Sequence, residues 1–184
     1  IMKIIGSVKE DLAVEKRNSI TPETIKKFAN INFSVFLERN YGIHQGITDE
    51  EFKKEGANML SSAKEVLEKS DIVLMLNFPS IDKIDSIKSE SILIGQFDLI
   101  LNKEIISKLL KKDIKIFSLN LLPRITRAQS MDVLSSQANL AGYRAVIESV
   151  EEFGKAVPMM MTAAGTITPA KVLVIGAGVA GLQA

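Results

Sequence analysis

Short apolar runs alternate with stretches of helical spacing over the first two thirds of this chain, and this alternation constrains its fold most. Five runs predict buried strands, at residues 2–5, 33–37, 71–76, 92–94 and 114–119. Strands that alternate with helices pair in parallel, because each crossover helix brings the next strand back in the same direction. The pattern therefore predicts an α/β fold with a doubly wound parallel sheet of the Rossmann or flavodoxin type.

Helix starts are recognisable between these runs. Thr21 is followed by a proline, which is favoured at the first helical position. Thr48 and Ser62 each have a glutamate three residues later, as in a capping box, and Asn102 is expected to cap the last helix of this series.

The last third of the chain has a different organisation. Apolar residues recur at helical spacing from about residue 130 to residue 153, which predicts a helix of about six turns. Residues 158–169 predict a hairpin about Gly165, and residues 171–175 predict a new buried strand. We therefore expect an N-terminal α/β domain at residues 1–127, a linker helix at 128–156, and a hairpin with the truncated start of a second, Rossmann-type domain at 157–184.

Three glycines follow that last apolar run at the spacing of a dinucleotide-binding turn. Gly176 permits a tight turn, Gly178 lets the backbone approach a pyrophosphate, and Gly181 lets the next helix pack on the strand. The motif alone is weak, but its place between a strand and a helix favours a dinucleotide site over a simple turn. The acidic residue that holds the ribose is expected about 20 residues later. That position lies beyond residue 184, so the sequence reads as a fragment.

A polar segment follows the fifth predicted strand and precedes the long helix. It contains Arg124, Gln129, Ser130 and Asp132. Open α/β sheets bind ligands outside the carboxyl ends of their strands, so this segment is a candidate site. The alternative is a polar loop that only caps the helix, which is common for this composition.

Composition excludes several classes of function. The chain has 23 basic and 22 acidic residues and a net charge of +1, so it has no basic surface for nucleic acid or for an anionic membrane. It has no cysteine, its single histidine is His44, and its carboxylates are scattered, so we predict no metal site and give His44 no role. No apolar run approaches the length of about 20 residues that crosses a bilayer, and we predict no membrane insertion.

Two long segments resemble a known family. They are PRITRAQSMDVLSSQANLAGYRAV and MMMTAAGTITPAKVLVIGAGVAGLQA, and the N-terminal KEDLAVEKRNSITPETI is similar to a segment shared with alanine dehydrogenase. The resemblance is to the NAD(H)-binding alpha subunit of the proton-translocating NAD(P) transhydrogenase. It implies hydride transfer between NAD(H) here and NADP(H) on a partner subunit, coupled to proton movement through a membrane subunit. It also implies a homodimer on the cytoplasmic face of the bacterial inner membrane, and a fragment alone would be inactive.

The resemblance also implies roles for four residues around the nicotinamide and its ribose: Arg124, Gln129, Asp132 and Ser135. Arg124 is suited to donate to the carboxamide oxygen, while Asp132 and Ser135 accept from its nitrogen. Gln129 suits a ribose hydroxyl. The three glycines, Gly176, Gly178 and Gly181, would hold the pyrophosphate.

Two other functions remain as alternatives. An alanine dehydrogenase would need an arginine near the N-terminus, a lysine after the third strand and a histidine after the fourth. Arg17 is present, but Asn77 stands where the lysine would fall, and residues 92–101 contain no histidine. The third possibility is a non-catalytic nucleotide-sensing module.

Overall fold

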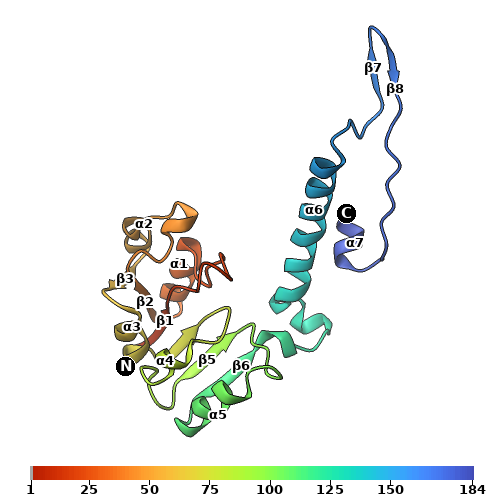
Figure 1. Cartoon of the computed structure of the whole chain (residues 1–184). Helices are drawn as coiled ribbons and strands as arrows, with labels where there is room; N and C mark the ends of the chain where they lie inside the picture. The colour runs from red at the N-terminus through yellow and green to blue at the C-terminus, as the bar shows by residue number, and fades with distance from the viewer. Residues whose placement is uncertain (1) are drawn as a thin grey trace. The chain divides into compact units, whose positions relative to one another are not determined.

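The computed structural model describes residues 2–184, and the chain divides into two compact units, Ile1–Leu122 and Pro123–Ala184. The first contains a twisted sheet with helices, and the second contains one long helix, a hairpin and a short helix (Figure 1).

The first unit is built on one six-stranded parallel sheet in the order β3-β2-β1-β4-β5-β6. Its strands are β1 (Lys3–Ser7), β2 (Phe33–Glu38), β3 (Ala57–Leu60), β4 (Ile72–Leu74), β5 (Ile92–Gly95) and β6 (Lys115–Ser118). The predicted doubly wound fold is confirmed. β3, an edge strand that pairs only with β2, is not among the predicted strands.

Five helices connect the strands: α1 (Pro22–Asn30), α2 (Asp49–Lys54), α3 (Ala63–Lys69), α4 (Ile81–Ile84) and α5 (Lys103–Lys111). The capping box of α2 is present, because the Glu51 carboxylate accepts from the Thr48 N–H at 2.7 Å and the Thr48 hydroxyl accepts from the Glu51 N–H at 3.3 Å. Asn102 is the N-cap residue of α5, as expected, but its side chain forms no capping hydrogen bond. The Asn102 side chain donates instead to the Asp98 carbonyl at 2.8 Å, so it holds the preceding turn.

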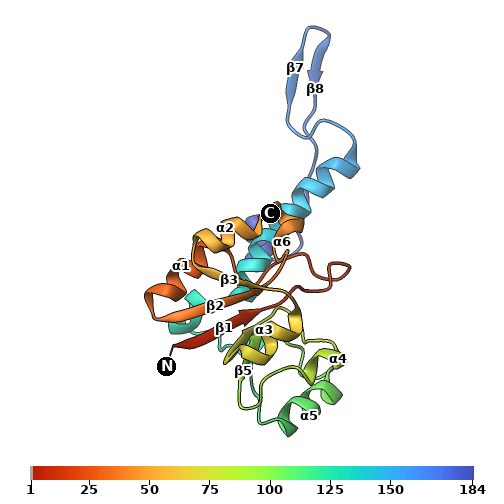
Figure 2. The same ribbon diagram turned by 90° about the vertical axis from the view of Figure 1, so that its left-hand side faces the viewer.

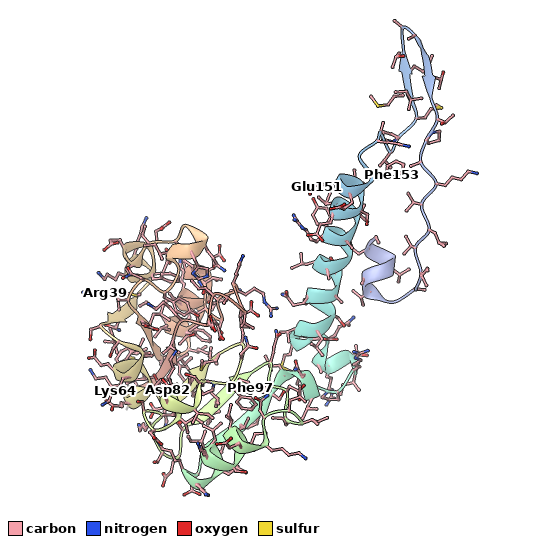
Figure 3. All side chains as sticks on the ribbon, in the orientation of Figure 1. Arg39, Lys64, Asp82, Phe97, Glu151 and Phe153 are labelled. Carbon is pink, nitrogen blue, oxygen red and sulfur yellow. The ribbon has the colours of Figure 1, made fainter. Side chains whose placement is uncertain are left out.

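Apolar side chains on both faces of the sheet form two core clusters, as a buried parallel sheet requires. One cluster joins β1 and β2 to α1 and α2 through Ile25 and Phe52. The other joins the middle of the sheet to α3, α4 and α5, and Figure 2 shows these two groups of helices on opposite sides of the sheet. Phe97, labelled in Figure 3, lies in the second cluster. Its ring stacks on that of Phe78, with ring centroids 4.3 Å apart.

The second unit begins with a 3₁₀ helix, Thr126–Met131, followed by α6 (Val133–Phe153). The antiparallel strands β7 (Met160–Thr162) and β8 (Gly165–Ile167) confirm the predicted hairpin, and α7 (Val179–Gln183) follows the glycine turn. The prediction of a buried strand at residues 171–175 is wrong. No strand within residues 2–184 pairs with this run, and Ile175 is 91% exposed. A strand must pair its backbone N–H and C=O groups before it can be buried.

Among residues 2–184, no helix has the length and apolar character that crossing a membrane requires.

Candidate functional site

The glycine turn has the steric features that its sequence predicts. Gly176 has φ = 121°, a backbone conformation that residues with a Cβ atom rarely adopt. A methyl group added at Gly181 would overlap the Gly176 carbonyl oxygen, so the third glycine permits the turn to close tightly against α7. In contrast, a methyl group added at Gly178 would have no heavy atom within 4 Å. The structure therefore leaves open space beside the second glycine, where the motif predicts a pyrophosphate.

The short helix α7 packs against α6. A methyl group added at Gly142 of α6 would overlap the Ala180 carbonyl oxygen, so glycine is needed for this close approach. Beside it, the Asn139 amide donates to the Gln183 side-chain oxygen at 3.0 Å. The glycine turn is thereby fixed to the middle of the long helix.

The start of α6 carries two of the predicted site residues in direct contact. The Asp132 carboxylate accepts from the Ser135 N–H at 2.9 Å and from the Ser135 hydroxyl at 2.6 Å. These hydrogen bonds from the Ser135 hydroxyl and N–H lower the pKa of Asp132, and the Arg124 charge acts in the same direction. Asp132 therefore is ionised at neutral pH and caps the helix. Its remaining lone pairs, and those of the Ser135 oxygen, are available to a ligand.

The other two predicted residues lie just before this cap. Arg124 and Gln129 are exposed, and neither side chain has a hydrogen-bond partner within residues 2–184. The Gln129 carbonyl accepts from the Asp132 N–H at 3.3 Å. The structure thus gathers a free cation, a free carboxamide and a fixed carboxylate–hydroxyl pair over a short stretch of chain. Within the described residues no carboxylate or imidazole cluster could hold a metal ion.

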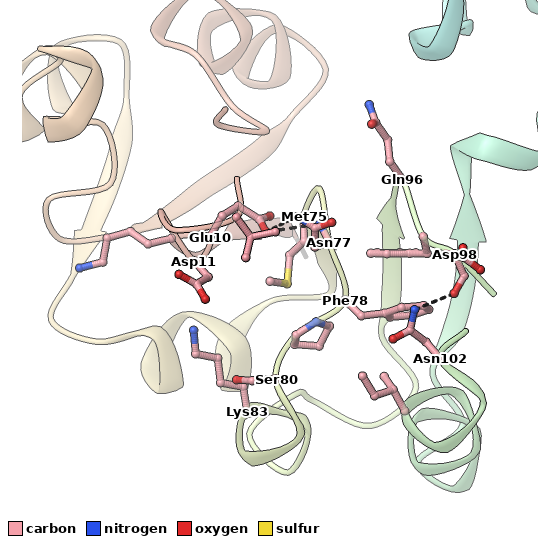
Figure 4. A pocket seen from close by; sticks show the side chains of 15 residues that line it. Glu10, Asp11, Met75, Asn77, Phe78, Ser80, Lys83, Gln96, Asp98 and Asn102 are labelled. Atoms are coloured by element: carbon pink, nitrogen blue, oxygen red, sulfur yellow. Dashed lines mark hydrogen bonds between the residues drawn. The ribbon is translucent and has the colours of Figure 1, made fainter. Parts of the chain in front are cut away.

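A separate cavity of about 410 Å³, here called the switch-point cavity, lies in the first unit at the carboxyl ends of β1, β4 and β5 (Figure 4). Asn77, which stands where an alanine dehydrogenase would need a lysine, lines it together with Gln96 from the segment 92–101 that contains no histidine. Arg17 is bound by Glu15, whose carboxylate accepts from the Arg17 Nε at 2.9 Å and from Nη2 at 2.7 Å. Glu10 also lines the cavity, and no pattern in the sequence predicts its contacts.

Two family models match the chain. The model described as "Alanine dehydrogenase/PNT, N-terminal domain" covers residues 6–141. This chain belongs to the alanine dehydrogenase/PNT family. The corresponding C-terminal domain model matches residues 145–184, as expected from the glycine turn.

Within the alanine dehydrogenase/PNT family, the most similar relatives include transhydrogenase subunits. The chain is 44% identical to an NAD(P) transhydrogenase subunit alpha protein of Rhodospirillum rubrum, over 98% of this chain and 48% of that protein. It is 42% identical to the protein of the same name from Rickettsia prowazekii, over 100% and 49%. The crystal structure of transhydrogenase from Sinorhizobium meliloti matches with a TM-score of 0.92 and 44% identity, over 98% and 52%. The chain thus spans about half the length of these relatives.

Proposed function

We propose that this chain supplies the nicotinamide half of an NAD(H) site in an NAD(P) transhydrogenase. The supporting observation is that α6 carries both parts of the candidate site. Ser135 lies in the first turn of the helix, and Gly142 lets the glycine turn approach the helix closely. At 1.5 Å per residue these positions are about 10 Å apart along the helix axis. That separation suits a dinucleotide that extends from its nicotinamide to its pyrophosphate.

The residues present fit such a ligand. The open space beside Gly178 admits a phosphate group, and the N–H groups at the start of α7 face an anion favourably. Around the carboxamide, Arg124 donates to the oxygen while Asp132 and Ser135 accept from the nitrogen, which fixes the presented face of the ring. The Gln129 carboxamide forms a hydrogen bond with a ribose hydroxyl. The nicotinamide itself carries the hydride, so these side chains have only to bind and orient it.

In the complete enzyme, NADP(H) would be held by a separate subunit, and proton translocation would occur in a membrane subunit. The relatives named as subunits of a transhydrogenase support this division. We also propose a homodimer that associates peripherally with the cytoplasmic face of the membrane through these subunits. We further propose that residues 157–184 belong to an NAD-binding domain, which the match of the C-terminal domain model to residues 145–184 supports.

Alanine dehydrogenase activity is the second candidate and is disfavoured by the switch-point cavity. Asn77 is a carboxamide that cannot donate a proton to a keto acid as a lysine would, and residues 92–101 contain no histidine to do so. A non-catalytic sensor would bind NADH and transfer no hydride.

The test is hydride exchange between NADH and an NADP⁺ analogue, in a complex reconstituted from the complete subunit and its partners. Arg124→Ala should slow exchange roughly 10- to 150-fold, because it removes a charge-assisted hydrogen bond that contributes about 1.5 to 3 kcal/mol. Binding of NADH should weaken less, because the adenosine and pyrophosphate are held elsewhere.

The matched control is Arg127→Ala, which removes an exposed arginine from the same segment. It should leave the rate within about twofold of the wild type. An unchanged rate in Arg124→Ala would contradict the carboxamide role, and NADH binding with no exchange in the wild-type complex would favour the sensor. Oxidation of alanine would favour the dehydrogenase.

A further inference from the structure

The sheet of the first unit has its topological switch point between β1 and β4. From β1 the chain order runs outward through β2 and β3 on one side, and through β4, β5 and β6 on the other. Loops diverge at the carboxyl ends of the two central strands, and open α/β sheets bind ligands in the crevice this creates. In this unit a side chain of the protein itself enters the crevice: Glu10, from the loop after β1.

The Glu10 carboxylate is held by backbone donors at the end of β4. Its Oε1 accepts from the Leu76 N–H at 2.6 Å, and its Oε2 accepts from the Asn77 N–H at 3.3 Å. The Asn77 amide approaches the same oxygen at 3.5 Å, and Figure 4 shows Glu10 directed at Asn77. Two successive backbone N–H groups converge on one carboxylate, which is how protein backbones form an anion site.

No ion pair accounts for this arrangement. Within residues 2–184 Glu10 forms no salt bridge, whereas the nearby Glu38 has the Lys9 ammonium at 3.3 Å. The Arg17 guanidinium, which is held by Glu15, acts on Glu10 only through its charge: the Glu10 carboxylate contributes to raising the pKa of Arg17. Burial raises the pKa of Glu10, while the N–H donors of Leu76 and Asn77 oppose that rise and Glu15 reinforces it. Asp11, Lys83 and Asp98 line the same cavity without a hydrogen bond to Glu10. The carboxylate is therefore bound in the manner of a ligand.

We propose that the Leu76 and Asn77 N–H groups form a carboxylate-binding site at the switch point, that Glu10 is its built-in ligand, and that a free monocarboxylate of acetate size binds there when the Glu10 side chain is removed. Glu10→Ala deletes the γ-carbon and the carboxyl group, which together have the skeleton of acetate. The adjoining cavity of about 410 Å³ gives a small anion access to the vacated position. This inference is independent of the nucleotide site.

In the wild type, the bound Glu10 acts as a latch. It joins the loop that follows β1 to the end of β4, across 66 residues of sequence. Other side chains hold the same loop from different sides: Glu38 accepts from the Lys9 N–H at 2.9 Å, and the Tyr41 hydroxyl accepts from the Ser19 N–H at 3.0 Å. Among these contacts, it is Glu10 that ties the loop to the switch-point crevice.

The experiment measures thermal unfolding of the full chain in acetate and in acetamide, its neutral isostere. Glu10→Ala should lower Tm, and acetate should restore about 3 to 6 °C at ten times its Kd. The restoration should be saturable and should be absent with acetamide. The control is Glu51→Ala, which also removes a carboxylate that accepts a backbone N–H, from an exposed site without a cavity. Equal effects of acetate and acetamide, or equal restoration of the two variants, would overturn the proposal.

A second measurement uses the unmodified chain and applies even if Glu10→Ala fails to fold. By NMR, the amide protons of Leu76 and Asn77 should shift with pH in step with the Glu10 carboxyl carbon, at a midpoint above the ordinary glutamate range. In Glu10→Gln those pH-dependent shifts should vanish. Amide shifts in the wild type that ignore the Glu10 titration would show that its carboxylate is not bound there.

Discussion

The most informative single change is Gly178→Ala, because the structure separates its effect on folding from its effect on the proposed ligand. Gly178 caps α7 with φ = −80° and ψ = −176°, an extended conformation that any residue adopts. No heavy atom lies within 4 Å of the position a β-carbon would take. The proposed pyrophosphate would approach through that space.

The expected change in stability is small. Alanine caps a helix less well than glycine, at a cost of about 0.5 to 1 kcal/mol. It also restricts the unfolded chain, which stabilises the fold by about 0.4 to 1 kcal/mol. These terms nearly cancel, so the free energy of unfolding should stay within about 0.5 kcal/mol of the wild type. NADH affinity should fall at least tenfold, or about 1.4 kcal/mol, because the methyl group occupies the approach of the phosphate.

Gly181→Ala is the matched comparison. Its β-carbon would lie 2.9 Å from the Gly176 carbonyl carbon and would overlap the attached oxygen. Overpacking of this kind costs about 1 to 3 kcal/mol, so this variant should lose stability as well as affinity. For each variant of the complete subunit, denaturant unfolding measures the stability and NADH fluorescence titration measures the affinity. Wild-type affinity in Gly178→Ala would refute the assignment of this turn to a pyrophosphate.

Two further predictions concern assembly and pH. On the hairpin, Met160 is 46% exposed and Met161 is 84% exposed, so this apolar surface is a candidate interface for the proposed homodimer. In sedimentation, Met160→Asp should be a monomer under conditions in which the wild type is a dimer. A monomer in both cases would contradict this proposal. The hydrogen bond from Lys88 at 2.6 Å and, less strongly, the Ile4 N–H lower the pKa of Asp71. A carboxyl group with a lowered folded-state pKa stabilises the fold above its unfolded-state pKa, and this stabilisation is lost as pH falls through the folded-state pKa. Asp71→Asn should therefore cost about 1 kcal/mol at pH 7, after screening by solvent, and less near pH 2. Urea unfolding at both pH values checks this, and an equal cost at both would contradict it.

The sequence predicted the alternation of strands and helices because the predicted strands are short runs rich in apolar residues, such as Ile72–Leu74 and Ile92–Gly95. It missed β3 because Ala57–Leu60 is a short edge strand with Asn58 in its middle, and such a strand has no alternating pattern. The run at residues 171–175 has the stronger strand pattern and yet pairs with no strand among the described residues. The local sequence shows which segments can form strands, whereas the strand with which each one pairs lies elsewhere in the sequence.

The same distinction applies to the sites. Asp132 and Ser135 could be predicted to meet, since a cap residue and the residue three positions later lie side by side at a helix start. The contacts of Glu10 could not, because its partners are 66 and 67 residues away and adjacent only through the parallel pairing of β1 with β4.

The two interpretations of the polar segment, helix cap and ligand site, are compatible in this geometry. The Asp132 carboxylate caps α6 by accepting hydrogen bonds from the Ser135 N–H and hydroxyl. These same hydrogen bonds keep Asp132 ionised and hold its carboxylate in one orientation. In the proposed site, a carboxylate fixed before the nicotinamide arrives loses little side-chain freedom on binding, so the cap serves as preorganisation. Because the same helix also holds the glycine turn at Gly142, one rigid element would set the spacing between the nicotinamide and the pyrophosphate.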